Sequence, residues 1–135
     1  MKAIDTNVLI RFLMKDDERQ SEAVYLIFKD AEEKRQELWV PLVVILETLW
    51  VLDSAYDIPR PEIVDTIDTL LQMPVLKFET QPALQQFVNL ARDTNLDLSD
   101  LLIAVSAKYS GADRILTFDA KASRLNFFEM IRINS

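Results

Sequence analysis

The sequence predicts an α/β fold in which a central, mostly parallel sheet of four to five short strands is flanked by helices on both faces. Short apolar runs alternate with longer segments in which apolar residues recur at helical spacing. Half of the 135 residues are hydrophobic and only one is glycine, which favours helix-rich structure over a glycine-punctuated β fold. No linker, repeat or low-complexity segment interrupts the chain, so we expect one domain over residues 1–135.

The first half of the chain gives two strands and three helices. A short apolar run predicts a first strand that ends at Asp5. The next segment predicts a helix that Asp5 or Thr6 can cap, because apolar residues recur at helical spacing at Val8, Leu9, Phe12 and Leu13. Residues 16–36 begin with acids and continue as an amphipathic helix. Residues 38–40 predict a buried strand. The segment 42–52 is apolar nearly all round, so we expect a helix that is buried on most sides.

The next part repeats the alternation. A turn with two prolines leads into an amphipathic helix over 62–73, which a further proline stops. Residues 75–78 predict a strand, and 82–95 predict a helix. An acidic, capping-box-like start then introduces a helix over 101–109, which we expect to end at Gly111.

The last part predicts a strand over 114–118, a short helix over 120–125 and a final strand over 127–133. Strands that alternate with helices in this way are typical of a parallel sheet.

The composition excludes several kinds of functional site. The chain has no cysteine and no histidine, which excludes disulfides, thiolate or imidazole metal sites and histidine-based catalysis. Any metal would need oxygen ligands, which favours Mg²⁺ or Mn²⁺. No apolar run could span a bilayer and no signal peptide precedes Asp5, so we expect a cytoplasmic protein without membrane contact.

The net charge of −7 argues against a broad basic surface for nucleic acid. The charge is uneven, however. Residues 1–100 hold 10 Lys and Arg against 19 Asp and Glu, whereas residues 101–135 hold 5 against 3. The uneven charge is therefore compatible with a local basic rim on an acidic protein.

Four of the 22 acidic residues adjoin strongly apolar segments, where a carboxylate loses hydration and needs a proton, a partner or a metal. They are Asp5, Glu47, Asp100 and Asp119. The three aspartates fall at predicted helix starts. For each of them, the alternative to a site role is that of an ordinary helix cap. Glu47 lies inside a helix, where its alternatives are a polar stripe with Thr48 or a buried arginine partner.

The positions of these acids bear on whether they meet. Asp5 and Asp119 follow predicted strands, and the carboxyl ends of parallel strands share one edge of a sheet. Asp100 opens a helix that would start near the opposite edge of the sheet. The spacing therefore does not settle whether Asp100 reaches the other acids. If all four converge, they cannot stay ionised together without cations. One or two Mg²⁺ or Mn²⁺ ions would then activate a water for attack on a phosphodiester.

Four acidic motifs occur in order along nearly the whole chain: IDTNVL at residues 4–9, ETLW at 47–50, LSDLLIA at 98–104 and LTFD at 116–119. In this order and spacing the chain resembles the PIN-domain ribonucleases, and within them the VapC-type toxins of toxin–antitoxin pairs. The resemblance implies a single PIN-like nuclease domain over residues 1–135. It also implies that the third aspartate joins the other acids in one pocket.

The resemblance assigns roles to particular residues. It implies that the catalytic, metal-binding acids are Asp5, Glu47, Asp100 and Asp119, with Asp5 and Asp100 as the best candidates for direct ligands. Two residues match supporting positions that form hydrogen bonds, Asn7 and Thr117. Asp97 competes with Asp100 and is better placed as the helix cap. A basic rim for the substrate could be formed by Arg11, Lys15, Lys121 and Arg124, for which the alternative is ordinary solvated surface.

The implied reaction is endonucleolytic cleavage of RNA that depends on Mg²⁺ or Mn²⁺ and leaves a 5′-phosphate and a 3′-hydroxyl. The implied partners are a cognate antitoxin, whose carboxyl-terminal segment would cover the groove, and a second copy of the chain. Four apolar residues could serve either a dimer face or, as the more ordinary choice, the core. They are Leu26, Phe28, Ile63 and Ile67.

Three other kinds of protein compete with this interpretation. A catalytically idle PIN-like domain could act as a binding module, although the intact set of four acids argues against it. A phospho-acceptor receiver domain would need an acid beside Asp5 and an aspartate after the third strand, where Phe78-Glu79-Thr80 offers none. A haloacid-type phosphatase would need Asp-x-Asp at the first strand, where Asn7 takes the second place.

Overall fold

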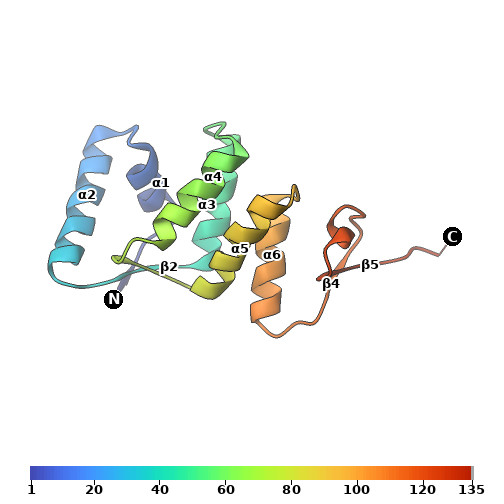
Figure 1. Ribbon diagram of the computed structural model, residues 1–135. Coiled ribbons are helices and arrows are strands. Elements are labelled where there is room, and N and C mark those ends of the chain that lie inside the picture. The colour runs from blue at the N-terminus through green and yellow to red at the C-terminus, as the bar shows by residue number, and fades with distance from the viewer. Residues whose placement is uncertain (135) are drawn as a thin grey trace. The chain divides into compact units, whose positions relative to one another are not determined.

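The computed structural model describes residues 1–134 of the chain. Their contacts group into two compact units, Met1–Gln81 (unit 1) and Pro82–Ser135 (unit 2). Six α-helices and parallel strands are found in the described part, which confirms the predicted α/β class (Figure 1). The prediction of one domain over residues 1–135 stays a prediction.

Unit 1 contains a parallel sheet of three short strands in the order β1-β2-β3. The strands are β1 (Lys2–Ala3), β2 (Leu38–Val40) and β3 (Leu76–Phe78). Leu38 lies opposite both Lys2 and Leu76. In β2 and β3 the first and third side chains are buried, so these strands contribute alternate residues to the core.

Four helices complete unit 1: α1 (Thr6–Met14), α2 (Glu18–Glu33), α3 (Leu42–Ser54) and α4 (Arg60–Leu71). Figure 1 shows α1 and α2 side by side at the amino-terminal end. Their contact includes Phe12 and Phe28, whose rings stack with centroids 4.5 Å apart. Helix α1 also packs against α3, and this second contact positions the candidate site.

Unit 2 contains α5 (Gln81–Asp93), which starts at the boundary between the units, and α6 (Leu98–Tyr109). It continues with β4 (Ile115–Thr117), a 3₁₀ turn η1 (Ala122–Arg124) and β5 (Phe128–Met130). Strands β4 and β5 form a second parallel pair. A small core joins α6, η1 and β5 through Ala104, Ala122 and Phe128. The expected five strands are thus present, paired as three and two.

Two expectations about burial need correction. Helix α3 is not buried on most sides, because Val43, Leu46 and Trp50 are 60%, 37% and 68% exposed. Among the four residues considered for core or dimer, Phe28, Ile63 and Ile67 are buried, whereas Leu26 is 55% exposed. An apolar residue shows that a helix can be buried on that side, but only the packing decides which side is covered. Among residues 1–134, every helix is too short or too polar to cross a membrane.

Helix α6 is terminated by Gly111, as the sequence predicts, with Tyr109 as its last residue and Ser110 as its cap. Gly111 has φ +95°, its N–H donates to the Lys108 carbonyl and the Ala112 N–H donates to the Ala107 carbonyl. This double hydrogen bond is the Schellman motif, which requires a left-handed residue after the helix.

We expect Gly111→Ala to lower the free energy of unfolding by about 1–2 kcal/mol, because a Cβ disfavours this backbone conformation. No heavy atom lies within 4 Å of the place that the Cβ would take, so the loss should come from the backbone alone. Gly111→Asn is the matched control and should lose less, since Asn tolerates left-handed geometry. Urea denaturation measures both variants, and equal losses would contradict the backbone explanation.

Candidate functional site

Asp5 stands at the junction between β1 and α1. Its backbone is extended, and its Oδ1 accepts a hydrogen bond from the Val8 N–H at 3.0 Å. Asp5 therefore caps α1, which confirms one of the two roles expected for it. Its Oδ2 has no hydrogen-bond partner in residues 1–134, and the side chain is exposed. Capping by one oxygen thus leaves the second carboxylate oxygen available to a ligand.

Glu47 projects from the exposed face of α3. Its Oε1 accepts a hydrogen bond from the Thr6 Oγ1 at 3.0 Å. Thr6 directly follows Asp5, so the packing of α1 against α3 brings Glu47 to the first acidic motif. The polar stripe that we considered for Glu47 and Thr48 is not found, because Thr48 is fully buried and donates to the Val44 carbonyl.

Thr6 contacts a candidate acid, a role that the sequence did not assign to it. The sequence predicts Thr6 only as a possible cap of α1, whereas its hydroxyl donates a hydrogen bond to Glu47. Its place next to Asp5 in the first motif was the available signal. Asn7, the predicted supporting residue, lies exposed in the first turn of α1, and its role stays a prediction.

Asp97 and Asp100 take different roles at the start of α6. Asp97 is the cap, since its side chain accepts a hydrogen bond from the Asp100 N–H at 3.1 Å. The prediction that Asp97 caps this helix is therefore confirmed. The Asp100 side chain is half-buried and does not serve as the cap of the helix.

The electrostatics of Asp100 differ from those of a surface aspartate. Burial raises the pKa of Asp100, and the negative charges of Asp97 and Asp119 raise it further. Asp100 and Asp119 thus interact within unit 2. The negative charges of these two neighbours would favour a positive charge beside Asp100.

Asp119 follows β4 and is built into a tight turn. Its Oδ1 accepts hydrogen bonds from the Lys121 N–H at 2.8 Å and from the Ala122 N–H at 3.4 Å. The Thr117 hydroxyl accepts from the Asp119 N–H at 2.9 Å. Thr117 therefore holds the backbone of Asp119, and its supporting role in a shared site stays a prediction.

The four predicted basic residues have different surroundings. Arg11 donates to Gln20 Oε1 at 2.6 Å and to Asp16 Oδ1 at 3.2 Å. Asp16 also accepts from the Tyr56 hydroxyl at 2.7 Å, and this hydrogen bond lowers the pKa of Asp16. Arg11 thus has a structural role that the sequence did not predict.

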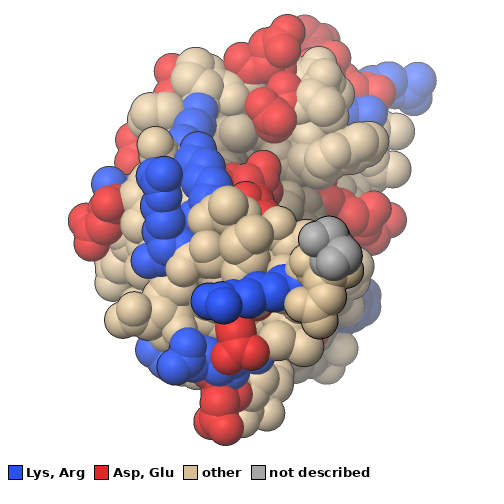
Figure 2. Space-filling model, turned by 90° about the vertical axis from the view of Figure 1, so that its right-hand side faces the viewer, with Lys and Arg blue, Asp and Glu red and all other residues tan. Residues whose placement is uncertain are grey.

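The other three basic residues are exposed, Lys15 at the end of α1, and Lys121 and Arg124 at η1. Figure 2 shows groups of Lys and Arg side chains with Asp and Glu side chains between and beside them, so no uniform basic surface is seen in this view. Contact of these residues with a substrate stays a prediction.

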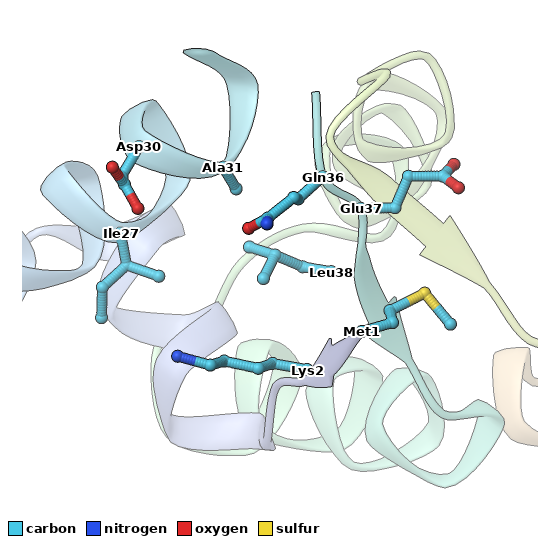
Figure 3. Close-up of a pocket in the computed structure, with 8 residues that line it drawn as sticks. All are labelled: Met1, Lys2, Ile27, Asp30, Ala31, Gln36, Glu37 and Leu38. Carbon is cyan, nitrogen blue, oxygen red and sulfur yellow. The ribbon is translucent and has the colours of Figure 1, made fainter. Parts of the chain in front are cut away.

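A separate cavity of about 390 Å³ opens in unit 1, beside the starts of β1 and β2. Figure 3 shows its lining, with Lys2 and Leu38 from the strands and Ile27 and Asp30 from α2. Asp5 lies beyond the opposite end of β1. The cavity contains none of the predicted site residues, and its mixed lining does not indicate a particular ligand.

The donor set suits a hard cation. The candidate acids offer carboxylate oxygens, which Mg²⁺ and Mn²⁺ prefer, and the chain has no histidine or cysteine that would favour zinc. Among residues 1–134, no three Asp or Glu side chains are grouped closely enough to hold a metal. Unit 1 contributes Asp5 and Glu47, and unit 2 contributes Asp100 and Asp119. A shared site of all four stays a prediction.

Comparison with known proteins supports the same interpretation. The chain is 28% identical over 127 residues to a protein named VapC ribonuclease from Aquifex aeolicus (strain VF5), and the match covers 94% of this chain and 93% of that protein. The sequence model of the PIN domain family matches residues 2–128. This match includes both units and all four candidate acids, and by it the chain belongs to the PIN domain family.

Proposed function

We propose that this protein is a metal-dependent endoribonuclease that acts in the cytoplasm as the toxin of a type II toxin–antitoxin pair. Two findings support the proposal: membership of the PIN domain family, and similarity along nearly the whole chain to a protein named VapC ribonuclease. The same membership removes the support for a receiver domain or a haloacid-type phosphatase.

The observation that carries the proposal is the hydrogen bond between Thr6 and Glu47. It joins residues that are 41 positions apart and belong to two separate acidic motifs. A surface glutamate without a function gains little from such a bond, because exposed polar contacts contribute little to stability. A nuclease gains from it, because the carboxylate is held in one orientation next to the first acidic motif.

Four acids would hold the metal, Asp5, Glu47, Asp100 and Asp119. Bound Mg²⁺ or Mn²⁺ would supply an activated water and would stabilise the charge that develops on the phosphate. Hydrogen bonds within the chain orient three of these acids. The Val8 N–H orients the Asp5 carboxylate, the Thr6 hydroxyl orients Glu47, and Thr117 fixes the backbone of Asp119. The products would be a 5′-phosphate and a 3′-hydroxyl.

The proposal includes two protein partners. One is a cognate antitoxin, which would silence the nuclease by covering its groove, and the other is a second copy of the chain in a homodimer. An idle PIN-like binding module is the second candidate function. The presence of an acid at each of the four motif positions favours the nuclease.

Cleavage of RNA by the purified chain tests the proposal. Single-stranded and structured RNAs are incubated with Mg²⁺, with Mn²⁺ and with EDTA, and the ends of the products are identified. We expect cutting that requires the metal and leaves 5′-phosphates. Cutting that persists in EDTA would contradict the proposed mechanism. An absence of cutting, combined with no binding of Mn²⁺ in calorimetry, would favour the idle module.

A further inference from the structure

An exposed stripe on α3 surrounds the candidate acid Glu47. Val43 and Leu46 lie before it, and Trp50 lies three residues after it. Residues spaced by three and four positions share one face of a helix. Trp50 is 68% exposed, which is unusual for an indole because burial of this side chain is strongly favourable. The stripe is therefore expected to be covered in the functional state.

The position of Glu47 indicates what covers the stripe. A second copy of the chain that buried the stripe would also remove the Glu47 carboxylate from water, and that costs several kcal/mol unless a partner charge compensates it. Charged residues are accordingly depleted in the centres of protein interfaces. A nucleotide with a divalent cation would use both parts of the stripe. The cation would bind the carboxylate, and the base would contact the apolar face.

The spacing between the two side chains fits one nucleotide. The Cβ atoms of residues three apart on a helix lie about 5–6 Å from each other. A phosphate bound to a divalent cation at the Glu47 carboxylate would thus leave its neighbouring base within reach of the Trp50 indole. Aromatic side chains that stack on bases are a general device of single-strand binding.

We propose that Trp50 is a substrate-positioning residue whose indole stacks on the base next to the scissile phosphate of a single-stranded RNA. This inference rests on the proposed nuclease function and adds a sequence-tolerant contact to it. An acidic protein gains little affinity from phosphate contacts. A stacking residue beside the acids would supply affinity that the net charge of −7 does not.

The test measures RNA binding separately from cleavage. A short fluorescent single-stranded RNA is titrated with the full chain in Ca²⁺, and electrophoresis confirms that the RNA stays intact. Trp50→Leu keeps an apolar side chain without a π face, and Trp50→Phe is the matched control. We expect Leu to weaken binding by about fivefold to 100-fold and Phe to retain most of the affinity. Circular dichroism verifies that both variants are folded.

An oligonucleotide with one abasic position provides the specific readout. If stacking is the contact, wild type and Trp50→Leu should bind the RNA that lacks the correct base with nearly equal affinity. Equal affinities of wild type and Trp50→Leu for the intact RNA would overturn the inference, even if the protein cleaves RNA. Loss of a dimer in Trp50→Leu, measured by sedimentation, would overturn it in favour of a second copy on the stripe. Cleavage assays with the same proteins show separately whether the nuclease proposal fails.

Discussion

Replacement of Asp5 with Asn is expected to abolish RNA cleavage and to leave the fold intact. The Asn side-chain oxygen can still accept the hydrogen bond from the Val8 N–H, because Asn and Asp are equally good helix caps. The substitution removes the negative charge that would bind the metal. Loss of an outer partner of a metal ligand costs about 10–100-fold in activity, so loss of the ligand itself should cost at least about 100-fold. Initial cleavage rates and thermal melting measure the two effects.

The chain offers a matched control in Asp17. This residue caps α2 in the same way, with its Oδ1 accepting from the Gln20 N–H at 3.0 Å, but it belongs to none of the four acidic motifs. Asp17→Asn should cleave RNA at the wild-type rate. Asp5→Ala should lose both activity and about 1 kcal/mol of stability, since it removes the cap as well. Full activity in Asp5→Asn would show that Asp5 is only a cap.

Local features of the site could be predicted from the sequence. The cap at Asp97 and the end of α6 at Gly111 were both predicted, because a cap depends on groups within about four residues along the chain. The same reasoning separated Asp97 from Asp100. The order of strands and helices also follows from local periodicity, which is why the α/β class was predicted.

Features that depend on packing could not be predicted in the same way. The hydrogen bond from Thr6 to Glu47 joins residues 41 positions apart, and no local pattern marks it. Strands of two or three residues carry little information about their partners, so the division of the five strands into a ladder of three and a ladder of two was not foreseen. The apolar sequence of α3 likewise gave no sign that Trp50 would be exposed.

The electrostatics of unit 2 lead to a second large effect, at Asp100. Burial and the charges of Asp97 and Asp119 raise the pKa of Asp100 above its ordinary value. The folded protein therefore binds this proton more tightly than the unfolded chain does. By linkage, the ionised group destabilises the fold above the ordinary pKa, and this destabilisation is relieved as the pH falls through the raised pKa.

We expect Asp100→Asn to lower the cleavage rate by at least about 100-fold and yet to melt at a higher temperature than wild type in EDTA at pH 7. The increase should disappear as the pH falls through the raised pKa of Asp100, where the wild-type carboxyl is also neutral. Addition of Mn²⁺ should reverse the order. A ligand at 100 times its Kd stabilises a fold by about 2.7 kcal/mol, and only the wild type retains the full set of acids.

Melting curves in EDTA and in Mn²⁺ at two pH values separate these effects without any measurement of activity. A variant that melts below wild type in EDTA would show that Asp100 stabilises the fold. That result would contradict the explanation that burial and nearby negative charges disfavour the ionised Asp100 in the folded protein. A variant that is stabilised by Mn²⁺ as strongly as wild type would remove Asp100 from the metal site. Higher stability without metal, combined with loss of both the Mn²⁺ response and cleavage, is the result that only a metal-binding acid at residue 100 explains.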